Sequence, residues 1–257
     1  MESKITILVL CYGDHLNLAK RCLSSIINNF DKNHYYLKVG LNKVSNETRD
    51  YVLSLNEVDD IYISKTNIHK PAMWRRMSKD IPTKWCMWFD DDSYVLEKNA
   101  LENRLNLINT QDFDMCGHMY FMNAEYEYFK KYIRQQNWYN QKPIPCGILH
   151  YENIFNTDGL EKRWFFLTGG NWLIKSELLE KFNYPSLNVS KYLIDNNIPA
   201  HDGDDILLCE VLRQNNCKLL DIGEMGIRIN DSARRGLSDI IDSKEYIRGE
   251  SDESHIQ

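Results

Sequence analysis

The first 95 residues alternate between short apolar runs and amphipathic stretches, and this alternation restricts the folds open to the chain. The apolar runs have the length and composition of buried strands and cover residues 4–11, 35–41, 61–63 and 85–89. The stretches between them have helical patterns and cover residues 15–30, 47–55 and 71–81, the last with Pro71 at its first position. A β-α-β-α-β-α-β order predicts an α/β protein with a mostly parallel, doubly wound sheet flanked by helices.

Composition supports a packed globule and argues against several classes of partner. The chain has 257 residues, of which 43% are hydrophobic and only 12 and 6 are Gly and Pro, so it is suited to one domain with a sizeable core. The net charge is −6 and the pI is about 5.7, which disfavours a nucleic-acid-binding protein. A local basic patch could still hold a ligand that carries phosphate.

The cysteines and the hydropathy pattern bear on location. Seven cysteines are scattered without a C-x-x-C pair, which favours reduced core thiols over disulfides or a zinc site. No run of about 18 apolar residues is present, and Met1 to Lys4 lead directly into the first strand without a signal-peptide pattern. We therefore expect a cytoplasmic protein, with peripheral membrane contact left open.

Three consecutive carboxylates, Asp90-Asp91-Asp92, follow the apolar run of residues 85–89. Adjacent anions repel one another, and a divalent cation would offset that cost. Hard oxygen ligands of this kind suit Mn²⁺ or Mg²⁺, with water and phosphate completing the coordination. An acidic turn without a metal is the alternative. In a doubly wound sheet, however, ligands bind at the carboxyl ends of the strands, where the turn after Cys11 and the loop from Asn42 also lie, and this favours a site.

Two later motifs contain candidate site residues. The sequence Gly169-Gly170-Asn171 precedes an apolar run and a helix that we expect to begin with Ser176 as its N-cap. Paired glycines allow a backbone to approach a ligand closely, although a tight turn would use them as well. Asp204 and Asp205 open an amphipathic helix, where acidic residues also serve as simple helix caps.

Aromatic residues are concentrated between Tyr120 and Phe166. Aromatics at helical spacing usually belong to a core. Trp138, beside polar residues, is a better candidate for an exposed stacking surface. Because sugar rings can stack their C–H faces on aromatic rings, we predict that Trp138, Trp164 and Trp172 contact an acceptor.

The order of these motifs resembles that of the GT-A fold glycosyltransferases, especially the family-2-like inverting enzymes. The resemblance covers about residues 4–222 and depends on the strand, turn and helix at the start, the Asp-rich strand end, the Gly-Gly-Asn loop and the acidic helix start. The sequence Trp88-Phe89-Asp90-Asp91-Asp92 is also similar to that of Fringe-like transferases. A DxD element alone is a weak signal, but the three motifs in order are fairly specific.

The resemblance implies a role for each donor-side residue. Asp92 would bind the metal, Asp90 would be a second metal ligand close to the donor ribose, and Asp91 could take either part. The Cys11–Tyr12 turn would form the edge that holds the nucleobase. Two positions depart from the family pattern. Asn42 stands where the family usually has an aspartate that binds the base, and its carbonyl could still accept from a nucleobase N–H, so it is predicted to contact the nucleotide. No histidine matches the late metal ligand of some relatives.

The later motifs would complete the catalytic site. Gly169, Gly170 and Asn171 would border the donor sugar and the acceptor. Asp205 would be the general base, and Asp204 would replace the glutamate of the family's Glu-Asp pair. Arg234 and Arg235 would offset diphosphate charge, or would form an ordinary exposed basic turn.

The implied activity is metal-dependent transfer of a sugar from a nucleotide sugar, with a UDP-sugar expected, to a hydroxyl on a glycan, a lipid-linked oligosaccharide or a protein. Inversion is favoured because Asp205, on a separate element, could face the anomeric carbon from the side opposite the diphosphate, although retention stays open. The alternatives are a sugar nucleotidyltransferase, whose Gly-rich phosphate loop is missing after the first strand, and a carbohydrate-binding protein on the same fold. We expect one domain over residues 1–237, with a nucleotide-binding half (1–95), an acceptor-binding half (96–237) and a polar tail (238–257).

Overall fold

The computed structural model describes residues 5–123, 163–182 and 215–229, together with Asp205, Leu208, Cys209, Val211 and Leu212. The side chains of residues 69, 71, 120–123, 163–165 and 168 are not among those described. In chain order the elements are β1 (Ile5–Tyr12), α1 (Leu16–Asn29), the 3₁₀ helix η1 (Lys32–His34), β2 (Tyr35–Asn42), α2 (Asn46–Leu53), β3 (Asp60–Ser64), α3 (His69–Met77), β4 (Trp85–Asp90), β5 (Tyr94–Val95), α4 (Ala100–Thr110), β6 (Met115–Asn123), β7 (Arg163–Lys175), α6 (Ser176–Lys181), β8 (Leu219–Asp221) and β9 (Ile227–Arg228).

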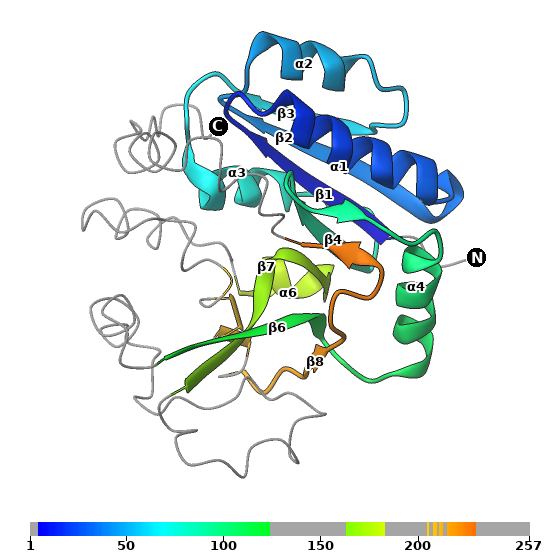
Figure 1. The fold of residues 1–257 in the computed structure, drawn as a ribbon. Coiled ribbons are helices and arrows are strands. Elements are labelled where there is room, and N and C mark those ends of the chain that lie inside the picture. The colour runs from blue at the N-terminus through cyan, green and yellow to red at the C-terminus, as the bar shows by residue number, and fades with distance from the viewer. Residues whose placement is uncertain are drawn as a thin grey trace.

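Seven of the strands form one sheet in the order β3-β2-β1-β4-β7-β6-β8 (Figure 1). The first four are mutually parallel, β8 is parallel to β6, and β7 is antiparallel to both of its neighbours. Strands from both predicted halves of the chain therefore belong to one sheet. A separate antiparallel pair, β5 with β9, joins Val95 to Ile227. The predicted α/β class with a mostly parallel central sheet is confirmed.

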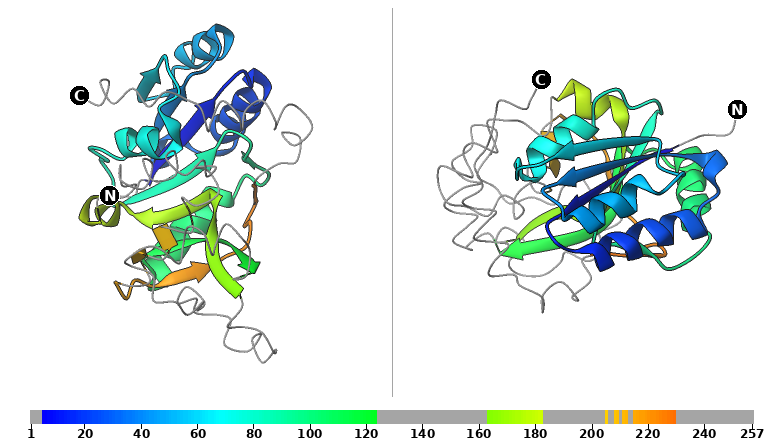
Figure 2. Two further views of the ribbon diagram at one scale, coloured as in Figure 1. Left: turned by 90° about the vertical axis from the view of Figure 1, so that its left-hand side faces the viewer. Right: turned by 90° about the horizontal axis from the view of Figure 1, so that it is seen from above.

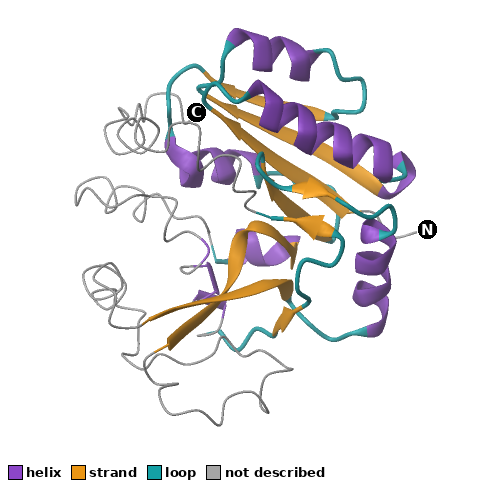
Figure 3. Ribbon diagram, in the orientation of Figure 1, coloured by secondary structure: helices purple, strands orange, loops and turns teal. Residues whose placement is uncertain are grey.

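Helices cover both faces of the sheet, which explains the continuous apolar runs in the sequence (Figures 2 and 3). Along β1, Leu8 and Leu10 pack in a cluster that includes residues of α3 and α6. Their neighbours Ile7 and Val9 pack in a second cluster, which includes residues of α1 and α4. Because side chains alternate between the faces of a strand, a strand covered on both faces needs apolar residues at every position. Among the described residues, no helix has the length and apolar character needed to cross a membrane.

Three local predictions differ from the structure. Helix α3 begins at His69, so Pro71 occupies its third position and not its first. Helix α6 begins at Ser176 with Lys175 as the N-cap, so Ser176 is not the cap. Gly169, Gly170 and Asn171 lie within the long strand β7 and not in a loop.

The strand position of the two glycines has a physical reason. On one side β7 pairs with β4, where Asn171 lies opposite Phe89. On the other side its register with β6 shifts between Gly117 and Met119, so that residues 168–171 fall in an irregular stretch of the pairing. Pairing of the β7 residues that flank the two glycines keeps the chain extended through them, and such an irregularity is a place where glycines are common.

Candidate active site

The acidic triplet lies at the carboxyl end of β4, beside the ends of β1 and β2. Leu10 pairs with Asp90, and Tyr12 pairs with Asn42 in the next strand. Asp91 is 2% exposed, and its Oδ2 accepts a hydrogen bond from the backbone N–H of Tyr12 at 3.1 Å. Asp92 is 8% exposed. The sheet therefore brings the first strand turn and the triplet together, as the sequence predicts.

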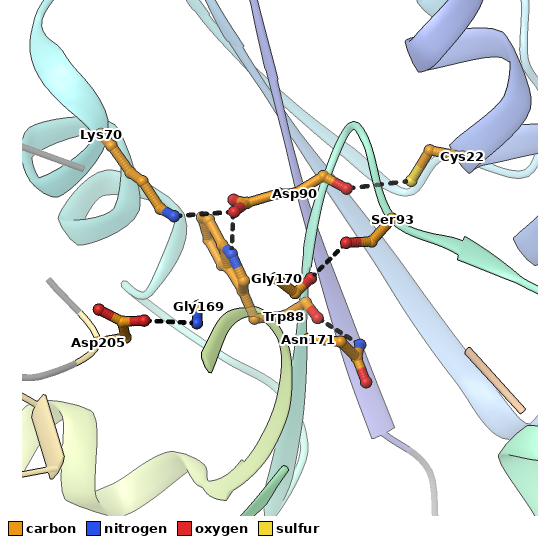
Figure 4. A network of polar contacts seen from close by, with 9 residues as sticks. All are labelled: Cys22, Lys70, Trp88, Asp90, Ser93, Gly169, Gly170, Asn171 and Asp205. Carbon is orange, nitrogen blue, oxygen red and sulfur yellow. Dashed lines mark hydrogen bonds and ion pairs between the residues drawn. The ribbon is translucent and has the colours of Figure 1, made fainter. Parts of the chain in front are cut away.

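The turn that carries Asp91 and Asp92 is fastened to β7. The backbone N–H of Ser93 donates to the carbonyl of Asp90 at 3.0 Å, which closes the turn. The Ser93 hydroxyl donates to the carbonyl of Gly170 at 2.9 Å (Figure 4). These bonds hold the acidic turn against the glycine pair that lies far from it in the sequence.

The neighbourhood of the triplet is strongly negative. Burial raises the pKa of the Cys22 thiol well above its ordinary value, and the nearby Cys11, Asp91, Asp92 and Asp90 raise it further. The Cys22 Sγ lies 3.7 Å from the carbonyl oxygen of Asp90. Because negative charge held at low exposure is costly, a cation beside Asp91 and Asp92 would stabilise this arrangement.

Asp90 has a hydrogen-bond donor at each of its two carboxylate oxygens. Its Oδ2 lies 2.9 Å from the Nζ of Lys70 on α3, and its Oδ1 accepts from the Trp88 indole N–H at 3.0 Å (Figure 4). The two side chains of this ion pair are only 12% and 17% exposed. Both oxygens of Asp90 therefore already have a strong partner, and a cation bound to Asp90 would share these oxygens with Lys70 and Trp88.

Asp205 lies beside this group. Its Oδ2 accepts a hydrogen bond of 2.8 Å from the backbone N–H of Gly169 (Figure 4). A Cβ built on Gly169 would lie 3.5 Å from Asp205 Oδ2 and 3.4 Å from Lys70 Nζ. The predicted base, Asp205, and the Lys70–Asp90 pair therefore both lie near Gly169. Residues of α3, β4 and β7 are in this way brought together with Asp205.

Asn42 and Cys11, which are predicted to contact the nucleotide, are both buried inside the protein. Asn42 is 1% exposed, and its Oδ1 accepts from the backbone N–H of Ile68 at 3.0 Å. Its Nδ2 donates to Asn67 Oδ1 at 3.0 Å, and Asn67 Nδ2 lies 3.5 Å from the Tyr12 hydroxyl. This network fixes the start of α3, so the Asn42 carbonyl is engaged by backbone. The Cys11 side chain is fully buried in the core beneath α1.

Asn171 connects strand β4 to the buried Arg104 through hydrogen bonds. It is 4% exposed, donates to the carbonyl of Trp88 at 2.6 Å, and accepts from Arg104 at 3.2 Å. Arg104 is buried and also donates to the carbonyls of Ala100, Glu224 and Met225. Burial lowers the pKa of Arg104 to about 10, which leaves it protonated at neutral pH.

Trp172 belongs to a buried tryptophan cluster. It is 1% exposed, and its ring centroid lies 5.9 Å from that of Trp88 and 5.0 Å from that of Trp74. A ring enclosed in this way does not offer a face to an acceptor, so the predicted contact does not fit. The cluster contacts the acidic strand end, since the Trp88 indole donates to Asp90.

Four predicted residues, Trp138, Asp204, Arg234 and Arg235, lie outside the described residues, and Trp164 is described only as part of strand β7. Lys70 is a site residue that the sequence analysis missed. The signal for it was available, because it follows the third strand at the start of a helix, and that junction lies at the same edge of the sheet as the acidic triplet.

The donor set fits a cation that takes most of its ligands from elsewhere. The described residues contain no group of three or more His, Cys, Asp or Glu side chains arranged to hold a metal ion. Carboxylates at low exposure, such as Asp91 and Asp92, are hard oxygen donors suited to Mn²⁺ or Mg²⁺ with phosphate and water as the other ligands. The residues therefore fit a metal held jointly with a bound nucleotide.

Comparison with known proteins identifies the fold. No protein-family model matches the chain, and the search of curated proteins returned no match. Among solved structures, TarS 1-349 from S. aureus in complex with UDP aligns with 98% of this chain and 68% of its own, at 12% identity and a TM-score of 0.55. The mannosyltransferase PcManGT from Pyrobaculum calidifontis, in complex with GDP-Man and Mn²⁺, aligns with 88% of this chain and 56% of its own, at 11% identity and a TM-score of 0.54.

A third structure, TarS 1-349 in complex with UDP-GlcNAc, aligns with 86% of this chain and 56% of its own, at 14% identity and a TM-score of 0.51. Another structure of TarS 1-349 aligns over 49% of its own length, so the chain spans about half the length of that solved chain. At these identities the matches show the fold, which is the GT-A fold predicted from the sequence.

Proposed function

We propose that the protein is a hexosyltransferase-type glycosyltransferase that moves a sugar from a nucleotide sugar to a hydroxyl acceptor with the help of Mn²⁺ or Mg²⁺. The observation that carries the proposal is the meeting of Asp205 with the Lys70–Asp90 pair at Gly169. Transfer needs a base close enough to the acidic strand end for both to reach one sugar. The fold, and the nucleotide sugars bound by proteins that share it, support this assignment.

The strand end would stabilise the leaving group. The nucleoside diphosphate gains negative charge as the anomeric bond breaks, and a divalent cation supplies the compensating charge when bound. In this chain Asp92 would hold that cation. The bond from Tyr12 fixes Asp91 beside it, and the bond from Ser93 to Gly170 holds the whole turn. A site held in this way needs little reorganisation as charge develops.

Asp205 would act as the general base. An acceptor hydroxyl is a weak nucleophile until a positioned carboxylate takes its proton during the attack. The hydrogen bond from Gly169 N–H orients the Asp205 carboxylate. Because Asp205 comes from a different element than the triplet, it can approach the anomeric carbon from the face opposite the diphosphate. This arrangement favours inversion.

The donor and the acceptor are the open parts of the proposal. A UDP-sugar is the first candidate, and GDP-sugars belong in any screen, since the similar proteins bind UDP, UDP-GlcNAc and GDP-Man. The structure gives Asn42 a backbone partner, so base selectivity would depend on other groups near Tyr12. Trp138 and Trp164 stay predicted acceptor contacts. A glycan, a lipid-linked oligosaccharide or a protein side chain in the cytoplasm would supply the hydroxyl.

A two-step assay tests the proposal. First, UDP-, GDP-, ADP- and dTDP-sugars are screened by thermal shift with and without Mn²⁺, because a ligand that binds only the native state raises its stability. Second, products released from the best donor are measured. Nucleoside diphosphate supports glycosyl transfer, pyrophosphate indicates a nucleotidyltransferase, and binding without release indicates a carbohydrate-binding protein. Absence of binding by every nucleotide sugar would contradict the proposal.

A further inference from the structure

Lys70 stands where three parts of the site meet. It is the second residue of α3, whose start is fixed by the bond from Ile68 N–H to the buried Asn42. Its Nζ lies 2.9 Å from Asp90 Oδ2 and 5.8 Å from the ring centroid of Trp88. Because the pair is largely shielded from water, it constrains both side chains more strongly than a surface ion pair would.

The same ammonium also lies close to the predicted base. The position that a Cβ on Gly169 would take is 3.4 Å from Lys70 Nζ and 3.5 Å from Asp205 Oδ2. The ammonium and the predicted base are therefore the nearest described side-chain groups to position 169. A lysine ammonium has three N–H donors, so it can hold Asp90 and donate to a bound molecule at the same time.

We propose that Lys70 contacts the transferred sugar of the donor and is a specificity residue for the nucleotide sugar over the free nucleoside diphosphate. This inference rests on the proposed function. A base must lie within hydrogen-bond reach of the acceptor oxygen, next to the anomeric carbon, and the diphosphate leaves on the opposite side. Lys70 and Asp205 both lie near Gly169, whereas Asp92 lies two residues beyond Asp90 in the following turn. The geometry therefore places the ammonium at the sugar, where it can donate to ring hydroxyls.

Calorimetry on the whole chain with Mn²⁺ tests this, using UDP-GlcNAc against UDP and GDP-mannose against GDP. Loss of a charge-assisted hydrogen bond weakens binding by about tenfold to a hundredfold. We expect Lys70→Met to weaken the nucleotide sugar by that factor and to leave the matching diphosphate within about threefold. The control is Lys65→Met, at an exposed lysine on the loop before α3, which should bind both as the wild type does.

A second variant separates sugar contact from support of Asp90. Lys70→Met leaves a partly buried carboxylate without its cation and can impair folding. The double variant Lys70→Met/Asp90→Asn removes both charges and should fold, as far-UV circular dichroism would verify. It should still lose its preference for the nucleotide sugar over the diphosphate, while Asp90→Asn alone should retain that preference.

The outcomes distinguish this inference from the proposed function. Equal weakening of nucleotide sugar and diphosphate in the Lys70 variants, or unchanged binding of both, would overturn the role of Lys70 while leaving a glycosyltransferase in place. Failure of the wild-type protein to bind any nucleotide sugar of the thermal-shift screen would overturn both proposals.

Discussion

Replacement of Gly169 by alanine should separate activity from stability. The added Cβ would lie 3.4 Å from Lys70 Nζ and 3.5 Å from both Cβ and Oδ2 of Asp205, which are ordinary van der Waals distances. Gly169 is not among the described glycines with a positive φ angle, so alanine meets no backbone strain. We therefore expect the free energy of unfolding to change by less than about 1 kcal/mol.

The effect on catalysis should be much larger, because the methyl group would occupy the space between the ammonium and the predicted base. A misplacement of reacting groups by about 1 Å can cost roughly a hundredfold in rate. We expect kcat/KM for nucleoside diphosphate release to fall by about that factor. Urea unfolding and the release assay on the same preparation measure the two quantities. Unchanged kcat/KM would show that no reacting group lies next to Gly169.

Gly226→Ala is the matched control with the opposite outcome. Gly226 has a φ angle of 74°, and an added Cβ would lie 2.9 Å from the Cβ of Glu97. The left-handed backbone and this overlap should lower the stability by about 1–3 kcal/mol. Gly226 directly precedes β9, which pairs with β5. The activity per folded molecule should therefore stay near that of the wild type.

Three further predictions test separate parts of the account. Asp92→Asn should weaken Mn²⁺-dependent nucleotide binding at least tenfold by calorimetry, and unchanged affinity would remove the metal role of Asp92. Arg104→Met removes the guanidinium bonds to four carbonyl oxygens, of which that of Glu224 keeps the Ile227 N–H as a donor. It should cost about 3–5 kcal/mol in urea unfolding, whereas a loss below 1 kcal/mol would show that the buried network is dispensable. Although burial opposes it, the hydrogen bond from Lys175 lowers the pKa of Asp114. That contribution is present above the unfolded-state pKa and is lost as the pH falls through the lower folded pKa. Asp114→Asn should therefore reduce the stability lost below about pH 4, and an unchanged acid profile would contradict this.

The sheet could be predicted because its determinants are local and periodic. The runs that became β1 and β4 are apolar at nearly every position, which only a strand covered on both faces needs. The alternation with amphipathic helices then fixed the parallel topology. The placement of Asp90, Asp91 and Asp92 beside the end of β1 followed from that topology alone.

The partners of the site side chains could not be predicted in the same way. Lys70 and Asp90 are separated by 20 positions, and only the packing of α3 on the sheet brings them together. Asn42 was expected to face a nucleobase, but the turn before α3 uses its carbonyl for a backbone N–H. The glycines at 169 and 170 have the local signature of a turn, and only pairing of β7 with two neighbouring strands decides otherwise.

The most direct test of the account compares turnover and donor affinity in Asp205→Asn. The substitution keeps the shape of the side chain and an oxygen able to accept from Gly169 N–H, but removes the base. We predict that donor affinity measured by calorimetry stays within about threefold while turnover falls by about 10²- to 10⁴-fold. Asp112→Asn, at a side chain that is 77% exposed, should change neither quantity. Near-normal turnover in Asp205→Asn would contradict the claim that this carboxylate and the acidic strand end serve one transfer reaction.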